Sequence, residues 1–274
     1  MAGVVAIIGN GFDLNLGMPT KYQDFLRSPY FPVLKDDDSG SLAWALMIKA
    51  DAQGWVDIEQ ELAAYSIKNG GTATFKEEYY ALRKALSQYL NSLPLPSNSS
   101  STHAHKLIQE VASKAELKIV NFNYTSSVKH LLRVMGLDED AIKGIHHSIH
   151  GIADDESIIF GVDDGSRVPE QHEFLYKSSA PNFLGIKVLA HLQSAHEIHF
   201  FGHSLGPPDH MYFRNYFEWL LSGNWPWTLN FYYYGEQGRF GLLSQLRLLA
   251  GGNVAQLRTN VNILMIDVAK PLSD

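Results

Sequence analysis

The residues with the clearest potential for chemistry form a glycine-rich segment near the N-terminus, IGNGFDLNLGMPTKY at 8–22. Gly9 and Gly11 follow an apolar run and precede a helical pattern, an arrangement that lets a phosphate approach the backbone at a helix N-terminus. Leu14 replaces the third glycine of the usual dinucleotide fingerprint, which disfavours an ordinary dehydrogenase. The pattern therefore predicts a ligand-binding loop. The alternative is a tight turn in which Asp13 caps the helix.

A second loop, FGHSLG at 201–206, follows another apolar run and matches the G-x-S-x-G pattern of esterase nucleophile elbows. In that class the acid and then the histidine come after the serine, whereas His210 is the only histidine beyond Ser204. Pro207 and Pro208 also disturb the helix that should begin directly behind the serine. We therefore interpret Gly202, His203 and Ser204 as a loop that lines a ligand site.

Three histidines lie close together in KGIHHSIHG at 143–151. The spacing of His146 and His150 would place both on one face of a helix, as metal ligands are often placed. The isoleucines and the final glycine favour a strand instead, in which His146, Ser148 and His150 point one way and His147 the other. No metal site is predicted.

Five segments in order resemble the AbiH family, bacterial abortive-infection proteins that act against phage. They are NGFDLNLGMPTKYQDFL at 10–26, WVDIE at 55–59, FNYT at 122–125, IHG at 149–151 and FGHSLGPPD at 201–209. The resemblance covers most of the chain and implies a role in phage defence, with a phage-derived protein as one candidate trigger.

The same segments are similar, more distantly, to the sirtuin pattern of a G-A-G-x-S-x-x-x-G-I-P loop, an Asn-containing segment, a His-Gly pair and a late G-T-S. That resemblance implies a sirtuin-type NAD-binding fold, with NAD as ligand or substrate, and Asn123 and His150 as the catalytic residues. It implies that the NAD-binding residues are Gly9, Asn10, Gly11, Phe12, Asp13, Gly17, Pro19, Thr20, Gly202, His203 and Ser204.

Departures from the sirtuin pattern limit what it implies. The chain has no cysteine, so the zinc module of those enzymes is absent and deacylation is disfavoured. A carboxylate at Asp13 would repel a pyrophosphate unless it faces ribose or caps the helix. In WVDIE, Asp57 and Glu59 either stabilise a helix N-terminus or contact a ribose or base.

The elements that must position these residues alternate between strand and helix. Continuous apolar runs predict strands at 4–8, 117–122, 145–149, 157–160, 197–201, 228–233 and 262–266. Helical spacing predicts helices at 125–135, 182–193, 210–221 and 242–250. This alternation predicts a single α/β domain over 1–274, with a mainly parallel, Rossmann-like sheet and helices on both faces.

Residues 41–93 interrupt the alternation with helical patterns at 42–52, 57–67 and 74–90 and without a convincing strand. We interpret them as a helical insertion. The Pro- and Ser-rich stretch 94–101 reads as a linker, and Thr102 as the cap of the helix that follows. The aromatic residues at 219–234 are expected to pack against the core.

Composition excludes several classes of protein. The chain of 274 residues is 45% hydrophobic and carries a formal net charge of −7, so it can bury a core and lacks the basic character expected of a nucleic-acid-coating protein. The absence of cysteine suits a reducing compartment, and the first apolar run is too short for a signal peptide or membrane span. We expect a cytoplasmic protein without membrane contact and leave a homo-oligomer open.

The leading hypothesis is an abortive-infection effector that hydrolyses NAD to nicotinamide and ADP-ribose. Two alternatives remain. In one, the same site senses a nucleotide without turnover and the insertion binds a protein partner. In the other, the protein is a toxin that acts on nucleic acid.

Overall fold

The computed structural model describes residues 3–33, 40–53, 58–68, 74–97, 101–155, 157–183 and 185–272. The chain divides into two compact units. Unit 1 comprises Met1–Met18, Leu95–Ile149 and Leu184–Asp274, and unit 2 comprises Pro19–Pro94 and His150–Phe183. The segment predicted as a helical insertion falls within unit 2.

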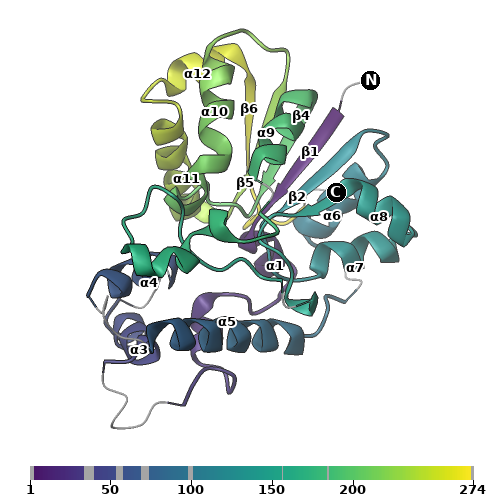
Figure 1. The fold of residues 1–274 in the computed structure, drawn as a ribbon. Helices are drawn as coiled ribbons and strands as arrows, with labels where there is room; N and C mark the ends of the chain where they lie inside the picture. The colour runs from purple at the N-terminus through teal and green to yellow at the C-terminus, as the bar shows by residue number, and fades with distance from the viewer. Residues whose placement is uncertain are drawn as a thin grey trace. The chain divides into compact units, whose positions relative to one another are not determined.

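Unit 1 is built on a six-stranded sheet in which every neighbouring pair of strands is parallel. The strands lie in the order β3-β2-β1-β4-β5-β6 (Figure 1). They are β1 (Gly3–Ile8), β2 (Leu117–Asn121), β3 (His146–Ser148), β4 (Ala195–Phe201), β5 (Thr228–Tyr233) and β6 (Asn262–Asp267). Every residue of β1 is buried, as expected for the apolar run of a central parallel strand. The predicted Rossmann-like fold class is confirmed.

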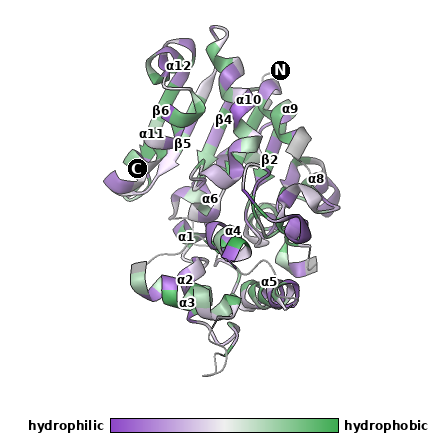
Figure 2. Cartoon of the chain, turned by 60° about the vertical axis from the view of Figure 1, so that its left-hand side comes forward, coloured by the Kyte–Doolittle hydropathy of each residue, from purple (hydrophilic) through white to green (hydrophobic). Residues whose placement is uncertain are grey.

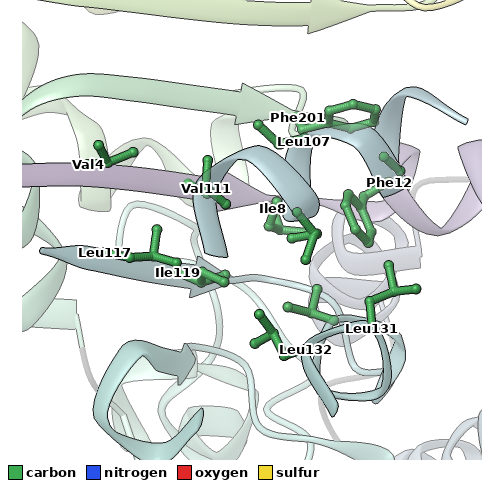
Figure 3. Close-up of a cluster of buried hydrophobic side chains, with 14 of the residues drawn as sticks. Val4, Ile8, Phe12, Leu107, Val111, Leu117, Ile119, Leu131, Leu132 and Phe201 are labelled. Carbon is green, nitrogen blue, oxygen red and sulfur yellow. The ribbon is translucent and has the colours of Figure 1, made fainter. Parts of the chain in front are cut away.

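The helices of unit 1 flank this sheet. They are α1 (Asn10–Asn15), α6 (His103–Ala112), α7 (Ser127–Val134), α8 (Glu139–Ile145), α9 (Gly185–Ser194), α10 (His210–Leu221), α11 (Gly235–Leu249) and α12 (Val254–Asn260). Strand alternation sends Val4 and Ile8 to one face, where they pack with Phe12 of α1 and with leucines of α6 and α7 (Figure 3). Helix α9 packs on β1 and β4.

Unit 2 is helical in its first stretch. Its helices are α2 (Tyr22–Leu26), α3 (Leu42–Gln53), α4 (Ile58–Lys68) and α5 (Phe75–Ser92), and its second stretch has 3-10 turns at Ala153–Asp155, Glu170–Leu175 and Lys177–Ser179. The ribbon of α5 carries both hydrophobic and hydrophilic residues (Figure 2). Its buried face includes Phe75, Tyr79, Leu82 and Leu86, which follow the i, i+4, i+7 spacing of an amphipathic helix.

One predicted strand is wrong. Residues 157–160 are not in a strand, although Ile158, Ile159 and Phe160 are buried. The carbonyl of Phe160 accepts a hydrogen bond from the Tyr79 hydroxyl of α5. The apolar run is therefore buried against a helix and not within the sheet. Periodicity alone does not distinguish these two kinds of burial.

Most other predicted elements are confirmed with shifts at their ends. The helix at 210–221 and the strand at 228–233 match their predicted bounds. The Thr102 side chain caps α6 by accepting a hydrogen bond from the backbone N–H of His105 at 3.2 Å. Strand β3 is shorter than predicted because Ile145 ends α8, and α2, α8 and α12 were not predicted.

Candidate functional site

The carboxyl edge of the sheet in unit 1 collects several of the predicted site residues. The chain places β2 and β3 on one side of β1 and then returns to place β4 on the other, so the strand order reverses between β1 and β4. Open α/β sheets bind ligands outside the carboxyl ends of their strands at such a reversal. Gly9 follows β1, Phe122 and Asn123 follow β2, and Gly202 follows β4. Three loops distant in sequence thus end at one edge.

The loops after β1 and β4 are joined backbone to backbone. The N–H of Gly9 donates to Phe201 O at 2.9 Å and the N–H of Gly11 donates to Gly202 O at 3.0 Å. A Cβ on Gly9 would lie 2.6 Å from His203 Cα, and a Cβ on Gly11 would lie 2.6 Å from Gly202 Cα. Both glycines are therefore required by the packing of one loop on the other, whatever a ligand needs.

Gly17, a predicted NAD-binding residue, ends helix α1. Its φ is +82° and its N–H donates to Leu14 O at 3.0 Å, while the N–H of Met18 donates to Asp13 O at 3.0 Å. These two bonds make a Schellman motif, in which the position after the helix favours glycine because of its left-handed conformation. The helix end explains this glycine without a ligand.

Asp13 lies on α1 with its side chain fully buried. Its carboxylate accepts hydrogen bonds from Thr125 Oγ1 at 2.6 Å and from Ser127 Oγ at 2.5 Å. Burial raises the pKa of Asp13 to about 6, although both hydroxyl hydrogen bonds lower it. The N-cap of α1 is Gly9, and no side chain caps the helix. The alternative in which Asp13 caps α1 is therefore wrong. Its carboxylate joins the loop after β1 to the loop after β2.

Asn123 lies between these polar groups, with 5% of its surface exposed. Its backbone N–H donates to Asn121 Oδ1 at 3.1 Å. Its side chain lies near enough to Asp13 to lower the pKa of that carboxyl slightly. Its Nδ2 nevertheless makes no hydrogen bond of regular geometry with the described residues. Buried donors are nearly always satisfied in native proteins, and an amide nitrogen has two N–H groups, so at least one of them requires a partner other than Asp13.

His203 is held on both sides of its ring. Nδ1 accepts the N–H of Leu205 at 3.0 Å, so the neutral ring carries its proton on Nε2, which lies 3.3 Å from Asp209 Oδ2. The ring also makes an edge-to-face contact with Phe122 at 4.4 Å between centroids. These contacts orient His203 toward protein groups.

Ser204 does not lie on a nucleophile elbow. Its Oγ accepts the N–H of Gly206 at 3.2 Å, and the positive φ of 53° in this loop belongs to Leu205. Helix α10 begins only at His210, whose Nε2 lies 2.9 Å from Leu205 O and 3.0 Å from Gln245 Oε1. His210 therefore braces the strained Leu205 backbone, and the geometry offers no serine–histidine pair here.

Two further predicted residues of the glycine segment differ in exposure. Phe12 is fully buried and packs edge to face on Phe201 at 5.5 Å, so it is a core residue. Asn10 is exposed at the start of α1. Pro19 and Thr20 belong to unit 2, where the Pro19 carbonyl accepts the hydroxyl of Tyr89 at 2.6 Å.

His150 also belongs to unit 2 and has 4% of its surface exposed. Its carbonyl accepts the N–H of Ile159 at 2.6 Å. Gly151 has φ of +72°, and a Cβ there would lie 2.0 Å from Ser157 O. The glycine of the His-Gly pair is thus explained locally, by its left-handed backbone and the close approach of Ser157. Strand β3 ends at Ser148, so the predicted strand alternation does not extend to His150.

Glu59 is buried near the start of α4 in unit 2. Its Oε2 lies 3.0 Å from Nζ of Lys177, whose side chain is 1% exposed. The carboxylate is thereby neutralised by a buried cation, which sequence reasoning did not predict because the two residues are 118 positions apart. Asp57 lies outside the described residues. The ribose or base contact of either residue stays a prediction.

Comparison with protein families decides what kind of protein this is. The family model described as "Bacteriophage abortive infection AbiH" matches residues 5–231. The chain belongs to the AbiH family. A comparison with curated proteins finds no match. Membership of the AbiH family supports a role in abortive infection by bacteriophage.

In this AbiH chain the matched region extends from within β1 to within β5 and includes the residues that meet at the carboxyl edge of the sheet. The structure adds Thr125 and Ser127 to the predicted site residues. The quoted FNYT segment already contained Thr125, but only the fold shows that both hydroxyls face Asp13.

The pKa values of two neighbouring histidines, the buried His146 and the half-buried His147, are lowered. Nε2 of His146 lies 3.2 Å from Asn121 Nδ2, and burial lowers the pKa of His146 to about 3. His147 stacks on His191 at 4.7 Å, and burial lowers its pKa to about 4. Among the described residues no group of three or more His, Cys, Asp or Glu could hold a metal ion. Nor does any described helix have the length and apolar character to cross a membrane.

Proposed function

We propose that the carboxyl edge of the sheet in unit 1 binds a nucleotide, that NAD is this nucleotide, and that its hydrolysis to nicotinamide and ADP-ribose is the act of this AbiH protein in phage defence. The observation that supports the site is the buried Nδ2 of Asn123. It lies beside the strand-order reversal, where a ligand carbonyl, ribose oxygen or bound water would satisfy it.

The choice of NAD draws on the sirtuin-like order of motifs together with this fold. The strand order of unit 1 is that of doubly wound dinucleotide-binding sheets. The N–H groups of Gly9 and Gly11 already bond to the loop after β4. We therefore expect pyrophosphate recognition to involve exposed groups beside the glycines, Asn10 and Ser204 among them.

The reaction adds water to the ribose carbon that bears nicotinamide, breaks the glycosidic bond and releases one proton. Positive charge develops on the sugar as that bond breaks. In the proposal, Asn123 holds the attacking water or a ribose hydroxyl through its amide, which contributes positioning. His150 of unit 2 is the proton acceptor that the sirtuin-like order of motifs implies, a general-base role that a neutral imidazole can fill.

One observation favours nucleotide sensing without turnover as a second candidate. Among the predicted site residues of unit 1, the titratable side chains are those of Asp13 on α1 and His203 in the loop after β4. The Asp13 carboxylate bonds to two hydroxyls, and His203 directs both ring nitrogens at protein groups. Neither is placed to accept a proton from a ligand, so unit 1 by itself fits binding better than hydrolysis.

Incubation of the purified full chain with NAD, followed by chromatography for nicotinamide, separates the two candidates. The assay is run with and without lysate from phage-infected cells, because a phage-derived trigger is part of the hypothesis. Nicotinamide release supports hydrolysis. NAD binding in calorimetry without release in either condition rejects hydrolysis and leaves sensing. Absence of both binding and release rejects the NAD site.

A further inference from the structure

A pocket within unit 2 is lined by none of the residues that the proposed function uses. It has a volume of about 290 Å³ and is lined by Tyr79, Tyr80, Arg83, Ser157, Ile158, Ile159, Phe160, Phe174, Tyr176, Ser179, Ala180, Pro181 and Asn182. Small-molecule sites range over roughly 300–1,000 Å³, so this pocket suits a ligand at the small end of that range.

Aromatic side chains make up five of the thirteen lining residues. The rings of Tyr79 and Phe174 lie 5.2 Å apart between centroids, and those of Tyr80 and Phe174 lie 6.1 Å apart at 30°. Tyr80 is 41% exposed, so part of this ring cluster is open to solvent. Exposed aromatic rings favour a planar ring as ligand, because stacking is stabilising and tolerant of the ring's identity.

The charge of the lining is positive. Arg83 is its only ionisable side chain besides the tyrosines, and no aspartate or glutamate contributes. The Arg83 guanidinium lies 5.2 Å from the centroid of the Tyr80 ring. It forms no ion pair with the described carboxylates. In a chain with a formal net charge of −7, an arginine that pairs with none of the described carboxylates favours an anionic ligand in this pocket.

A second cation, Lys76, adds to the positive charge near the pocket. Lys76 is seven residues before Arg83 on α5, and this spacing places both on one side of the helix. Its Nζ lies 5.8 Å from the centroid of the Phe174 ring. The lining also includes the polar residues Ser179 and Asn182, and Nδ2 of Asn182 donates to Ser157 O at 3.1 Å.

We infer that this pocket binds a small anion that carries a planar ring, a nucleoside monophosphate in chemical class, with the phosphate at Arg83 and the ring against Tyr80 and Phe174. The site is formed wholly by unit 2. It does not depend on the proposed function, and the two sites are separated by variants of Asn123 and Arg83.

Titration calorimetry of the full chain with AMP, adenosine and ribose 5-phosphate tests the inference. AMP is expected to bind, and each of the other two at least about tenfold more weakly, because each lacks one of the two recognised groups. Arg83→Gln is expected to weaken AMP binding at least about tenfold, and Tyr80→Ala to weaken it several-fold. Circular dichroism verifies that both variants are folded.

Lys84→Gln is the matched control, since Lys84 is exposed on the same helix and does not line the pocket. It removes the same charge and is expected to leave AMP binding unchanged. The inference is overturned if AMP does not bind, if ribose 5-phosphate binds as tightly as AMP, or if Arg83→Gln and Lys84→Gln have equal effects. Loss of AMP binding in Asn123→Ala with retention in Arg83→Gln would assign AMP to unit 1 and also overturn it.

Discussion

The carboxylate of Asp13 accepts a hydrogen bond from the hydroxyl of Ser127 at 2.5 Å, across 114 positions of sequence. Together with the bond from Thr125, it links the first helix after β1 to the start of α7 after β2. The polar groups at the carboxyl edge of the sheet are therefore organised around one buried carboxyl, whose protonation influences the stability of unit 1.

The pKa of Asp13 leads to a pH-dependent prediction. Its pKa is about 6 in the folded protein, against 3.8 as the reference value, so the folded state holds the proton more tightly than the unfolded state. The contribution of Asp13 to stability must rise as the pH falls from about 7 to about 4, by up to roughly 3 kcal/mol. Asp13→Asn removes this dependence.

Urea unfolding of the wild type and of Asp13→Asn between about pH 4 and pH 8 measures this pH dependence. The difference in free energy of unfolding, wild type minus Asp13→Asn, should be larger at the acidic end, and taking this difference cancels other titrating groups such as His146. Parallel pH profiles would show that the carboxyl is not perturbed.

A second prediction concerns Gly11. A phosphate-loop interpretation expects Gly11→Val to block ligand binding while the sheet stays intact. Because a Cβ would lie 2.6 Å from Gly202 Cα, we expect even Gly11→Ala to displace the loop after β4 and to lower the free energy of unfolding by roughly 1–3 kcal/mol.

Gly241→Ala is the control for that substitution. Gly241 lies within α11, and a Cβ there meets nothing within 4 Å. Alanine is favoured over glycine inside a helix, so this variant should gain up to about 1 kcal/mol. Both variants are compared by thermal or urea unfolding. Equal free energies of unfolding for Gly11→Ala and Gly241→Ala would refute the packing of the loop after β1 on the loop after β4.

The third prediction tests the proposed catalytic residues. Asn123→Ala and His150→Ala should each reduce NAD cleavage at least about 100-fold while nucleotide binding persists. Unfolding of Asn123→Ala is measured alongside, because this side chain is buried beside Asp13. His203→Ala should reduce cleavage less, because its ring nitrogens are directed at protein groups.

Asn224→Ala, at an exposed position, provides the control. Initial rates of nicotinamide release measure all four variants. If His150→Ala retains full activity while Glu59→Gln is inactive, the proton acceptor is Glu59 and the role given to His150 is wrong.

The fourth prediction concerns the buried pair of Glu59 and Lys177. Lys177→Met leaves the Glu59 carboxylate buried without its cation, so it should lower the free energy of unfolding by roughly 3–5 kcal/mol. The double variant Glu59→Leu with Lys177→Met should recover much of that loss, since an apolar pair needs no charge compensation. Additive effects of the two single changes in a double-mutant cycle would argue against the pair.

Several features of this AbiH protein follow from the sequence by itself. The apolar run before Gly9 predicts a buried parallel strand, and the alternation of such runs with helical spacing predicts the doubly wound sheet. These features are local, because the types of consecutive residues determine both the apolar run of a strand buried on both faces and the periodicity of a helix. The order of the matched segments likewise sufficed to indicate the AbiH family.

The tertiary structure alone decided why the predicted site residues have the types they do. Gly9 and Gly11 are constrained by the loop around Gly202, and the Asp13 and Glu59 carboxylates find partners more than a hundred positions away. Residues 157–160 show the same limit, because an apolar run indicates that residues are buried but not which element covers them. Such partners are determined by the path of the whole chain, so they cannot be predicted from local sequence patterns.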